Sequence, residues 1–258
     1  MKVVSLEDGH EQDFWKHVNR DPLDYYFFIF DLKQRREKTQ VFLALEGRKI
    51  EGLMLLYAGH VVQLRGSREA VKLLLDGVDI EQVELQAPMD CEDIVLRRYT
   101  PSLRFEIVLM RLRRGDENIR MKHVPVRLGV EDIEEFAEVL RKADPEVWGD
   151  LDIEQQKATW KDAFLMGIKH QGKLVSVGNS HFGDIASSIG AIATDERYRN
   201  MGFATSVVSA LVQKILKNSS TALIHVRKDN APAVRVYSKV EFKPYRQYLM
   251  IRGRRTSS

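Results

Sequence analysis

The sequence is poor in the residues that mark several classes of protein. Its 258 residues include one cysteine, seven prolines and 16 glycines. A single cysteine cannot form an internal disulfide, and so few prolines and glycines exclude a collagen-like or low-complexity chain. We therefore expect a folded protein of a reducing compartment, with the cytoplasm as the default location.

Long apolar runs are also missing. The longest, Tyr25–Phe30 and Leu53–Ala58, fall far below the roughly 18 residues that a membrane-spanning helix needs. The chain reaches Glu7 and Asp8 before any stretch that could serve as a signal peptide. These absences predict a soluble protein with no membrane partner.

Charge of one sign is scarce as well, because 40 Lys and Arg face 37 Asp and Glu, a net charge of +3. This falls short of the dense basic face that binds a nucleic-acid backbone, so we expect no nucleic-acid partner. The charge is unevenly divided, however: residues 1–118 carry a net −3 and residues 119–258 a net +6. The second half is the better candidate for an anionic ligand.

The polar, glycine-containing stretch at 113–118 predicts a boundary between two domains, 1–118 and 119–258. In the first, the patterns predict helices at 24–35 and 67–75, the latter capped by Ser67, and strands at 41–45, 50–57, 60–64, 83–86 and 103–112.

In the second, they predict strands at 122–128, 165–170, 173–181, 185–194 and 221–226, two terminal strands near 242 and 247–251, and helices through 133–140, 153–164, 204–215 and 231–239. Both halves share a strand-strand-strand-helix-strand order, which is an α/β (α+β) pattern.

The segment from Ile189 to Thr205 carries the strongest signal of chemistry. A hydrophobic strand runs into a polar turn, and Arg199-x-x-Gly202-x-Ala204-Thr205 opens a helix. The first N–H groups of a helix lack intrahelical partners and lie at the positive end of its dipole, so such a start binds anions. The alternative interpretation is an ordinary strand-to-helix turn.

This segment resembles motif A of the GCN5-related N-acetyltransferase (GNAT) family, whose signature is Q/R-x-x-G-x-G/A after the fourth strand. The run from Asn230 to Phe242 resembles the family's N-x-x-A-x-x-x-Y-x-K-x-G-F segment, and the likeness covers about residues 120–252. It implies a mixed sheet with splayed central strands flanked by helices. It also implies transfer of an acetyl group from acetyl-coenzyme A to a primary amine of a small molecule or a protein, by a monomer or homodimer.

The resemblance further implies roles for individual residues. The main chain at Ile192 and Thr194 would pair with the pantetheine arm, and Asn230 would contact the cofactor arm unless it serves only as the N-cap of the next helix. The pyrophosphate would be held by Arg199 and by the amides of Met201, Gly202, Phe203, Ala204 and Thr205.

Catalysis is less completely defined by the sequence. Tyr237 is the expected general acid, since a phenol with a pKa of about 10 stays protonated at neutral pH; the alternative is a helix aromatic packed on the sheet. Several family members carry a glutamate eleven residues before Arg199, where this chain has Ser188. The base is therefore left open among candidates chosen by location alone: His181, Asp150, Asp152 and Glu196.

Two further departures need an explanation. Glu241 stands where the family usually has glycine, so a turn with unusual backbone angles is expected to be strained there. Cys91 lies outside the matched domain, which favours direct attack over a route through a thiol, and no His or Cys pattern suggests a metal site.

The first half lacks the R-x-x-G-x-A motif. It is interpreted either as a degenerate copy of the same fold that no longer binds cofactor and walls the substrate cleft, or as an unrelated α/β domain. The main rival function for the whole chain is a non-catalytic acyl-coenzyme A binding or sensing protein, favoured by the missing glutamate.

Overall fold

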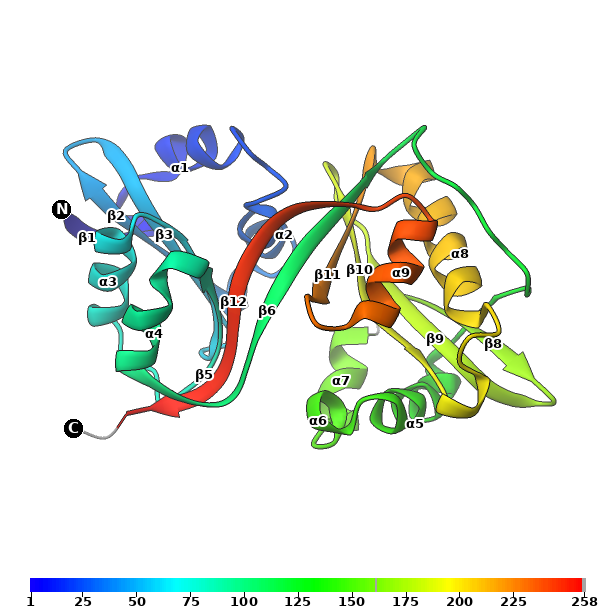
Figure 1. Ribbon diagram of the computed structural model, residues 1–258. Helices are drawn as coiled ribbons and strands as arrows, with labels where there is room; N and C mark the ends of the chain where they lie inside the picture. Colours follow the sequence, from blue (N-terminus) through cyan, green and yellow to red (C-terminus); the bar gives the residue numbers. More distant parts are fainter. Residues whose placement is uncertain (161, 257–258) are drawn as a thin grey trace. The chain divides into compact units, whose positions relative to one another are not determined.

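The contacts of the computed structural model divide the chain into two compact units, coloured along the sequence in Figure 1. The structure describes residues 1–160 and 162–256, with the side chains at 155, 156, 158 and 159 left aside. Unit 1 comprises Met1–Val108, Arg227–Asp229 and the C-terminal segment from Arg246; unit 2 comprises Leu109–Val226 and Asn230–Tyr245. The boundary predicted at residue 118 stays a prediction, but the C-terminal segment packs with the N-terminal half.

Unit 1 is built on a sheet whose strands are antiparallel neighbours except for one parallel pair, β4 and β5. Their order is β1 (Lys2–Ser5), β2 (Thr39–Glu46), β3 (Lys49–Tyr57), β4 (Val61–Gly66), β5 (Gln82–Pro88) and the C-terminal part of β12 (Lys243–Arg255). The last strand of the chain therefore completes the sheet of the first unit.

Helices cover both faces of this sheet, because alternate strand residues point to opposite sides. On one face α3 (Arg68–Asp76) and α4 (Glu92–Arg98) pack on a cluster that includes Met54, Leu64 and Leu85. On the other, α1 (Glu11–Val18) and α2 (Tyr26–Gln34) pack on Leu43 and Leu53. Strand β6 (Tyr99–Arg113) then runs from unit 1 into unit 2 (Figure 1).

The strands of unit 2 are antiparallel neighbours apart from the pair of β10 and β11. Their order is β7 (Val126–Arg127), β8 (Phe164–His170), β9 (Lys173–His181), β10 (Ser187–Thr194) and β11 (Thr221–Arg227). The hairpin between β8 and β9 turns at Gln171 and Gly172, whose φ values of 50° and 79° suit a tight turn.

The two faces of the sheet formed by these strands carry different helices. Val177 packs in a cluster with Phe136 of α5 (Ile133–Ala143) and Trp160 of α7 (Ile153–Trp160). A Cβ added at Gly178, the next residue of β9, would meet Val207 and other atoms of α8 (Phe203–Asn218). Helix α9 (Ala231–Lys239) contacts α8, and the short α6 (Pro145–Trp148) follows α5.

The predicted α/β class is confirmed, and most predicted elements are present. Three differ from the structure. The strand expected at 122–128 is reduced to β7, because the main chain at 120–123 bonds to α8. The helix expected at 153–164 ends at Trp160, and the two terminal strands form the single long β12. The short elements β1, α1, α4 and α6 were not predicted.

Both units repeat one order of elements. Unit 1 runs β2-β3-β4-α3-β5-α4, and unit 2 runs β8-β9-β10-α8-β11-α9. In each, three antiparallel strands are followed by a helix, a strand parallel to the third, and a second helix.

Glu241 allows the expected strain after α9 to be tested, since its φ is +79°. A left-handed residue with a Cβ costs about 1 kcal/mol more than glycine there. We predict that Glu241→Gly has a free energy of unfolding about 1 kcal/mol above that of Glu241→Ala in urea titrations. Both variants lose the same exposed ion pair to Lys243, so equal stabilities would contradict the strain.

Candidate functional site

Strands β10 and β11 of unit 2 pair over only three residues. The parallel ladder joins Ser187 to Ala222 and ends at Ile189 and Ile224, after which the two strands are no longer hydrogen-bonded. The register of β10 against β9 also shifts between Ile189 and Ile192. The next residues of β10 are Gly190 and Ala191, so no bulky side chain of β10 fills the space where the strands part.

The turn after β10 leads into a helix start without a side-chain cap. Gly202, the N-cap residue of α8, has φ of +93° and supplies no side-chain hydrogen bond. The first helical bond runs from Ser206 N–H to Gly202 O, which leaves the N–H groups of Phe203, Ala204 and Thr205 without intrahelical partners. With no acidic residue in the first turn, this end is a favourable place for an anion.

A segment before β7 is tied to the same helix end. The main-chain N–H groups of Lys122 and His123 both donate to Ser206 Oγ at 3.1 Å, and that hydroxyl donates to Gly202 O at 3.0 Å. One turn further along α8, Ser209 Oγ accepts from Arg120 N–H. Ser206 and Ser209 are fully buried, so these bonds replace the strand pairing expected here.

His123 also holds the turn itself. Its Nε2 lies 3.0 Å from Met201 O, and its ring stacks on Phe203 with centroids 3.9 Å apart. In a trans peptide the C=O and the following N–H point in opposite directions, so fixing Met201 O fixes the direction of Gly202 N–H. The stem of Lys122 lies within 3.8 Å of a Cβ placed on Gly202, which brings another cation to this turn.

The structure places the other predicted ligands around these features. Arg199 is exposed, and its guanidinium donates to Ala143 O, the last carbonyl of α5, at 3.0 Å. Ile192 and Thr194 lie opposite Gly178 and Ser176 of β9, on the part of β10 that has left β11.

Asn230 caps a helix. Its Oδ1 accepts from Ala233 N–H at 3.1 Å, at the start of α9. The capping interpretation of Asn230 is therefore confirmed, while its contact with a cofactor stays a prediction.

Tyr237 lies on α9 with only 5% of its surface exposed, its ring meeting Phe242 edge to face at 6.2 Å. Burial raises the pKa of the Tyr237 phenol well above its usual range. The side chain is thus protonated at any physiological pH and suits a proton donor, although the packing interpretation describes its surroundings equally well.

The candidate bases differ in their surroundings. Asp152 Oδ1 accepts from Glu154 N–H at 2.9 Å at the start of α7, and Asp150 and Glu196 are exposed. His181, the last residue of β9, lies directly opposite Ser188 across the ladder. The two side chains therefore share a face of the sheet, which the sequence alone did not reveal.

Comparisons with known proteins agree with this geometry. Residues 166–251 match the family described as FR47-like protein. A solved Drosophila protein has a TM-score of 0.72 at 12% identity, covering 96% of this chain and 98% of that one. A GNAT-family acetyltransferase from Colwellia psychrerythraea has a TM-score of 0.59 at 13% identity, covering 98% and 100%.

A tandem GNAT protein from the clavulanic acid biosynthesis pathway has a TM-score of 0.54 at 14% identity, covering 92% of this chain and 88% of that one. The chain therefore has the fold of these GNAT structures, and part of unit 2 matches the FR47-like family. No curated protein matches the chain in sequence. At these identities the solved structures establish the fold and not the reaction.

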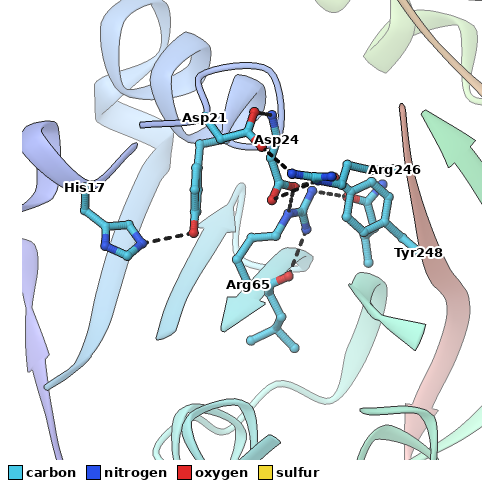
Figure 2. Close-up of polar contacts among 9 residues, drawn as sticks. His17, Asp21, Asp24, Arg65, Arg246 and Tyr248 are labelled. Carbon is cyan, nitrogen blue, oxygen red and sulfur yellow. Dashed lines mark hydrogen bonds and ion pairs between the residues drawn. The ribbon is translucent and has the colours of Figure 1, made fainter. Parts of the chain in front are cut away.

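Unit 1 has a buried polar cluster at the corresponding place among its strands (Figure 2). Strands β4 and β5 pair up to Gln63 and Gln86 and then part. Arg65 lies two residues beyond the last pair on β4, the position that Ala191 occupies on β10. Arg65 is 4% exposed, and its Nη2 donates to Gln86 Oε1 at 2.7 Å, so a side chain bridges the strands.

Asp24, just before α2, neutralises this arginine. Its Oδ1 accepts from Arg65 Nε at 2.7 Å and from the Tyr248 hydroxyl of β12, while the Arg65 guanidinium lies 4.0 Å from the centre of the Tyr248 ring. Arg246, also on β12, donates to Asp21 at 2.6 Å (Figure 2). Burial raises the pKa of the Tyr248 phenol far above its usual range, which keeps it a donor. The cluster thus joins β4, β5, β12 and the start of α2.

The described residues add two negative findings. No helix among residues 1–160 and 162–256 combines the length and apolar character needed to cross a membrane. The same residues contain no group of three or more His, Cys, Asp or Glu side chains placed to hold a metal ion.

Asp24→Ala is expected to lower the free energy of unfolding by about 3 kcal/mol, because it leaves the buried Arg65 charge without its carboxylate. The matched control is Asp21→Ala, whose partner Arg246 is 47% exposed, and we expect it to cost about 1 kcal/mol or less. Urea titration measures both, and hydrogen exchange should show β12 amides from Tyr248 to Arg254 opening first in Asp24→Ala. Equal losses in the free energy of unfolding for the two variants would contradict the greater importance of Asp24.

Proposed function

We propose that unit 2 transfers an acetyl group from acetyl-coenzyme A to a primary amine by direct attack. One observation carries this proposal: β10 leaves β11 after Ile189 and continues through Arg199 into the uncapped start of α8. A strand with unpaired main-chain groups and an anion-binding helix end thus follow each other along the chain. An elongated ligand with amides at one end and phosphates at the other matches that order.

The residues present fit this substrate. The main chain at Ile192 and Thr194 would bind its amide-rich arm. The phosphates would be held by the turn, through Arg199 and the amides of Met201, Gly202, Phe203, Ala204 and Thr205. Asn230, besides capping α9, would orient the arm at that helix start. Acetyl-coenzyme A itself supplies the thioester, whose carbonyl is open to an amine.

Tyr237 would donate the proton that the departing thiolate needs, and its buried, protonated phenol supports that role. A covalent route through a thiol has no support. Burial raises the pKa of Cys91 to about 12, and this residue belongs to unit 1. So basic a thiol is almost wholly protonated at neutral pH and is a poor nucleophile.

For unit 1 we propose a degenerate copy of the same domain, without acetyl-coenzyme A. Three observations support this. The two units share their element order, α3 is capped by its own Ser67 hydroxyl through Ala70 N–H, and Arg65 occupies the place of Ala191. Because α3 is capped and Arg65 bridges β4 and β5, unit 1 has neither the anion-binding helix start nor the unpaired strand of the proposed site.

A second function, acyl-coenzyme A binding without turnover, is favoured by Ser188, since a serine cannot take up a proton at neutral pH. Calorimetry with acetyl-coenzyme A, beside thiol release on a panel of amines, separates the two functions. We expect one molecule bound per chain and thiol released with some amine. Binding without release on any amine would favour the sensor, and no binding would refute both functions.

Arg199→Ala is expected to weaken acetyl-coenzyme A binding about 10- to 100-fold, the value of one charge-assisted hydrogen bond to phosphate. Arg197→Ala is the matched control, because that exposed arginine two residues away is held by Asp195 at 2.7 Å. Calorimetry measures both dissociation constants. An unchanged affinity of Arg199→Ala would remove this residue from the site.

Tyr237→Phe is expected to lower turnover by about 10²- to 10⁴-fold, the contribution of a general acid, and to leave binding of acetyl-coenzyme A within about twofold. Tyr198→Phe, on the 3₁₀ turn before Arg199, controls for the loss of a phenol. Steady-state thiol release gives kcat and KM for each variant. Equal turnover of Tyr237→Phe and the unaltered protein would leave Tyr237 with its packing role alone.

A further inference from the structure

Two polar residues of β9 lie on one face of the unit 2 sheet. Gly178 faces α8, so alternation along the strand turns Asn179 and His181 to the opposite face, the one that α5 and α7 cover. Only 2% of Asn179 is exposed, and its Oδ1 is a buried acceptor without a hydrogen-bond partner among the described residues. An unsatisfied buried amide is costly and calls for a reason.

The position of that amide supplies the reason. A Cβ added at Gly190 would lie 2.5 Å from Asn179 Oδ1, so the amide occupies the room that the glycine leaves. Gly190 is the first residue of β10 beyond its last pair with β11. The unpartnered oxygen therefore lies beside the point where the two strands part, which is where the proposed function needs the reacting groups.

His181 completes the pair. Its Nε2 lies 3.4 Å from Asn179 Nδ2, and the side chain is partly exposed. Imidazole is the side chain best suited to accept a proton near neutral pH. The described residues place no other imidazole in hydrogen-bond contact with Asn179.

We propose that His181 is the general base of the transfer and that Asn179 is its positioning residue; the inference rests on the proposed function. The amine nitrogen forms a bond to the thioester carbonyl carbon, and the carbon–sulfur bond breaks. An amine that arrives protonated first gives one proton to His181, which passes it to water; the neutral nitrogen then attacks and gives its second proton to His181, while Tyr237 gives a proton to the leaving sulfur. Exchange with water then returns both side chains to their starting states, so protons and electrons balance.

Asn179 suits a base that gains charge during the reaction. Neutral His181 accepts from the amide nitrogen at Nε2, whereas the imidazolium needs an acceptor at the same place. A half-turn of the amide about its last torsion brings the unpartnered Oδ1 to that nitrogen. The same residue can therefore hold the ring before and after proton uptake, without adding a buried charge.

The kinetic test compares two amines at one pH. An alkyl amine arrives protonated at pH 7 and needs a base, whereas an aryl amine arrives neutral. We expect His181→Gln to lower kcat for the alkyl amine by about 10²- to 10⁴-fold and for the aryl amine far less, with acetyl-coenzyme A affinity unchanged by calorimetry. Equal losses for both amines, or no loss, would overturn the base assignment.

A second experiment tests whether replacing His181 by alanine lowers turnover because a proton acceptor is lost. Ser188 lies directly across the ladder from His181, so Ser188→Glu places a carboxylate at the vacated position. The double variant His181→Ala, Ser188→Glu should regain alkyl-amine turnover, while His181→Ala, Ser188→Gln should not. Equal activity of the two double variants would contradict the proposal. Absence of thiol release by the unaltered protein would instead remove the proposed function, and this role with it.

The role of Asn179 has a readout that needs no substrate. In protein labelled with nitrogen-15 histidine, the signals of His181 are identified by their loss in His181→Gln. We expect Asn179→Leu to change the His181 nitrogen shifts at constant pH, and the exposed Asn218→Leu to leave them unchanged. Unaltered His181 signals in a folded Asn179→Leu protein would show that the amide does not hold the ring.

Discussion

The early end of the parallel ladder between β10 and β11 is the constraint on which the candidate site depends. A parallel pair normally satisfies main-chain groups along its length, and here it stops at Ile189 and Ile224. Beyond that point the main-chain groups of β10 that face β11 need other partners, and Gly190 and Ala191 add no large side chain there. A ligand with its own amides can form hydrogen bonds with those groups, so binding the ligand offsets the free-energy cost of leaving them unpaired.

Unit 1 meets the same constraint differently. Its β4 and β5 also part after three pairs, but Arg65 reaches across to Gln86 and is neutralised by Asp24. Tyr248 of β12 covers the Arg65 guanidinium, so the final strand of the chain helps to bury this charge. One architecture thus leaves β10 unpaired with β11 beyond Ile189 in one unit and places a hydrogen-bonded arginine between the corresponding strands of the other.

How much of this the sequence could predict depends on whether the deciding contact is local. A cap bonds to a residue three positions away, so the sequence predicts Ser67 as an N-cap and offers that role as the alternative for Asn230, and it predicts α9 over its observed span. The bonds from Lys122 and His123 to Ser206, more than 80 positions away, leave no local pattern, so a strand is predicted in their place. The pairing of His181 with Ser188 and of β12 with β5 likewise depends on sheet register, which a single sequence does not specify.

Besides the β8–β9 hairpin, left-handed backbone occurs in unit 2 where the chain enters α8 and where it leaves α9. Asn200 and Gly202 are left-handed before α8, and Glu241 is left-handed after α9. Left-handed backbone costs glycine little, so Gly202 adopts it without strain at the start of α8. At Glu241 the same conformation directs the chain from α9, which carries Tyr237, into β12. A non-glycine residue is tolerated there because its neighbours Val240 and Phe242 are both buried, and packing on both sides outweighs one unfavourable φ.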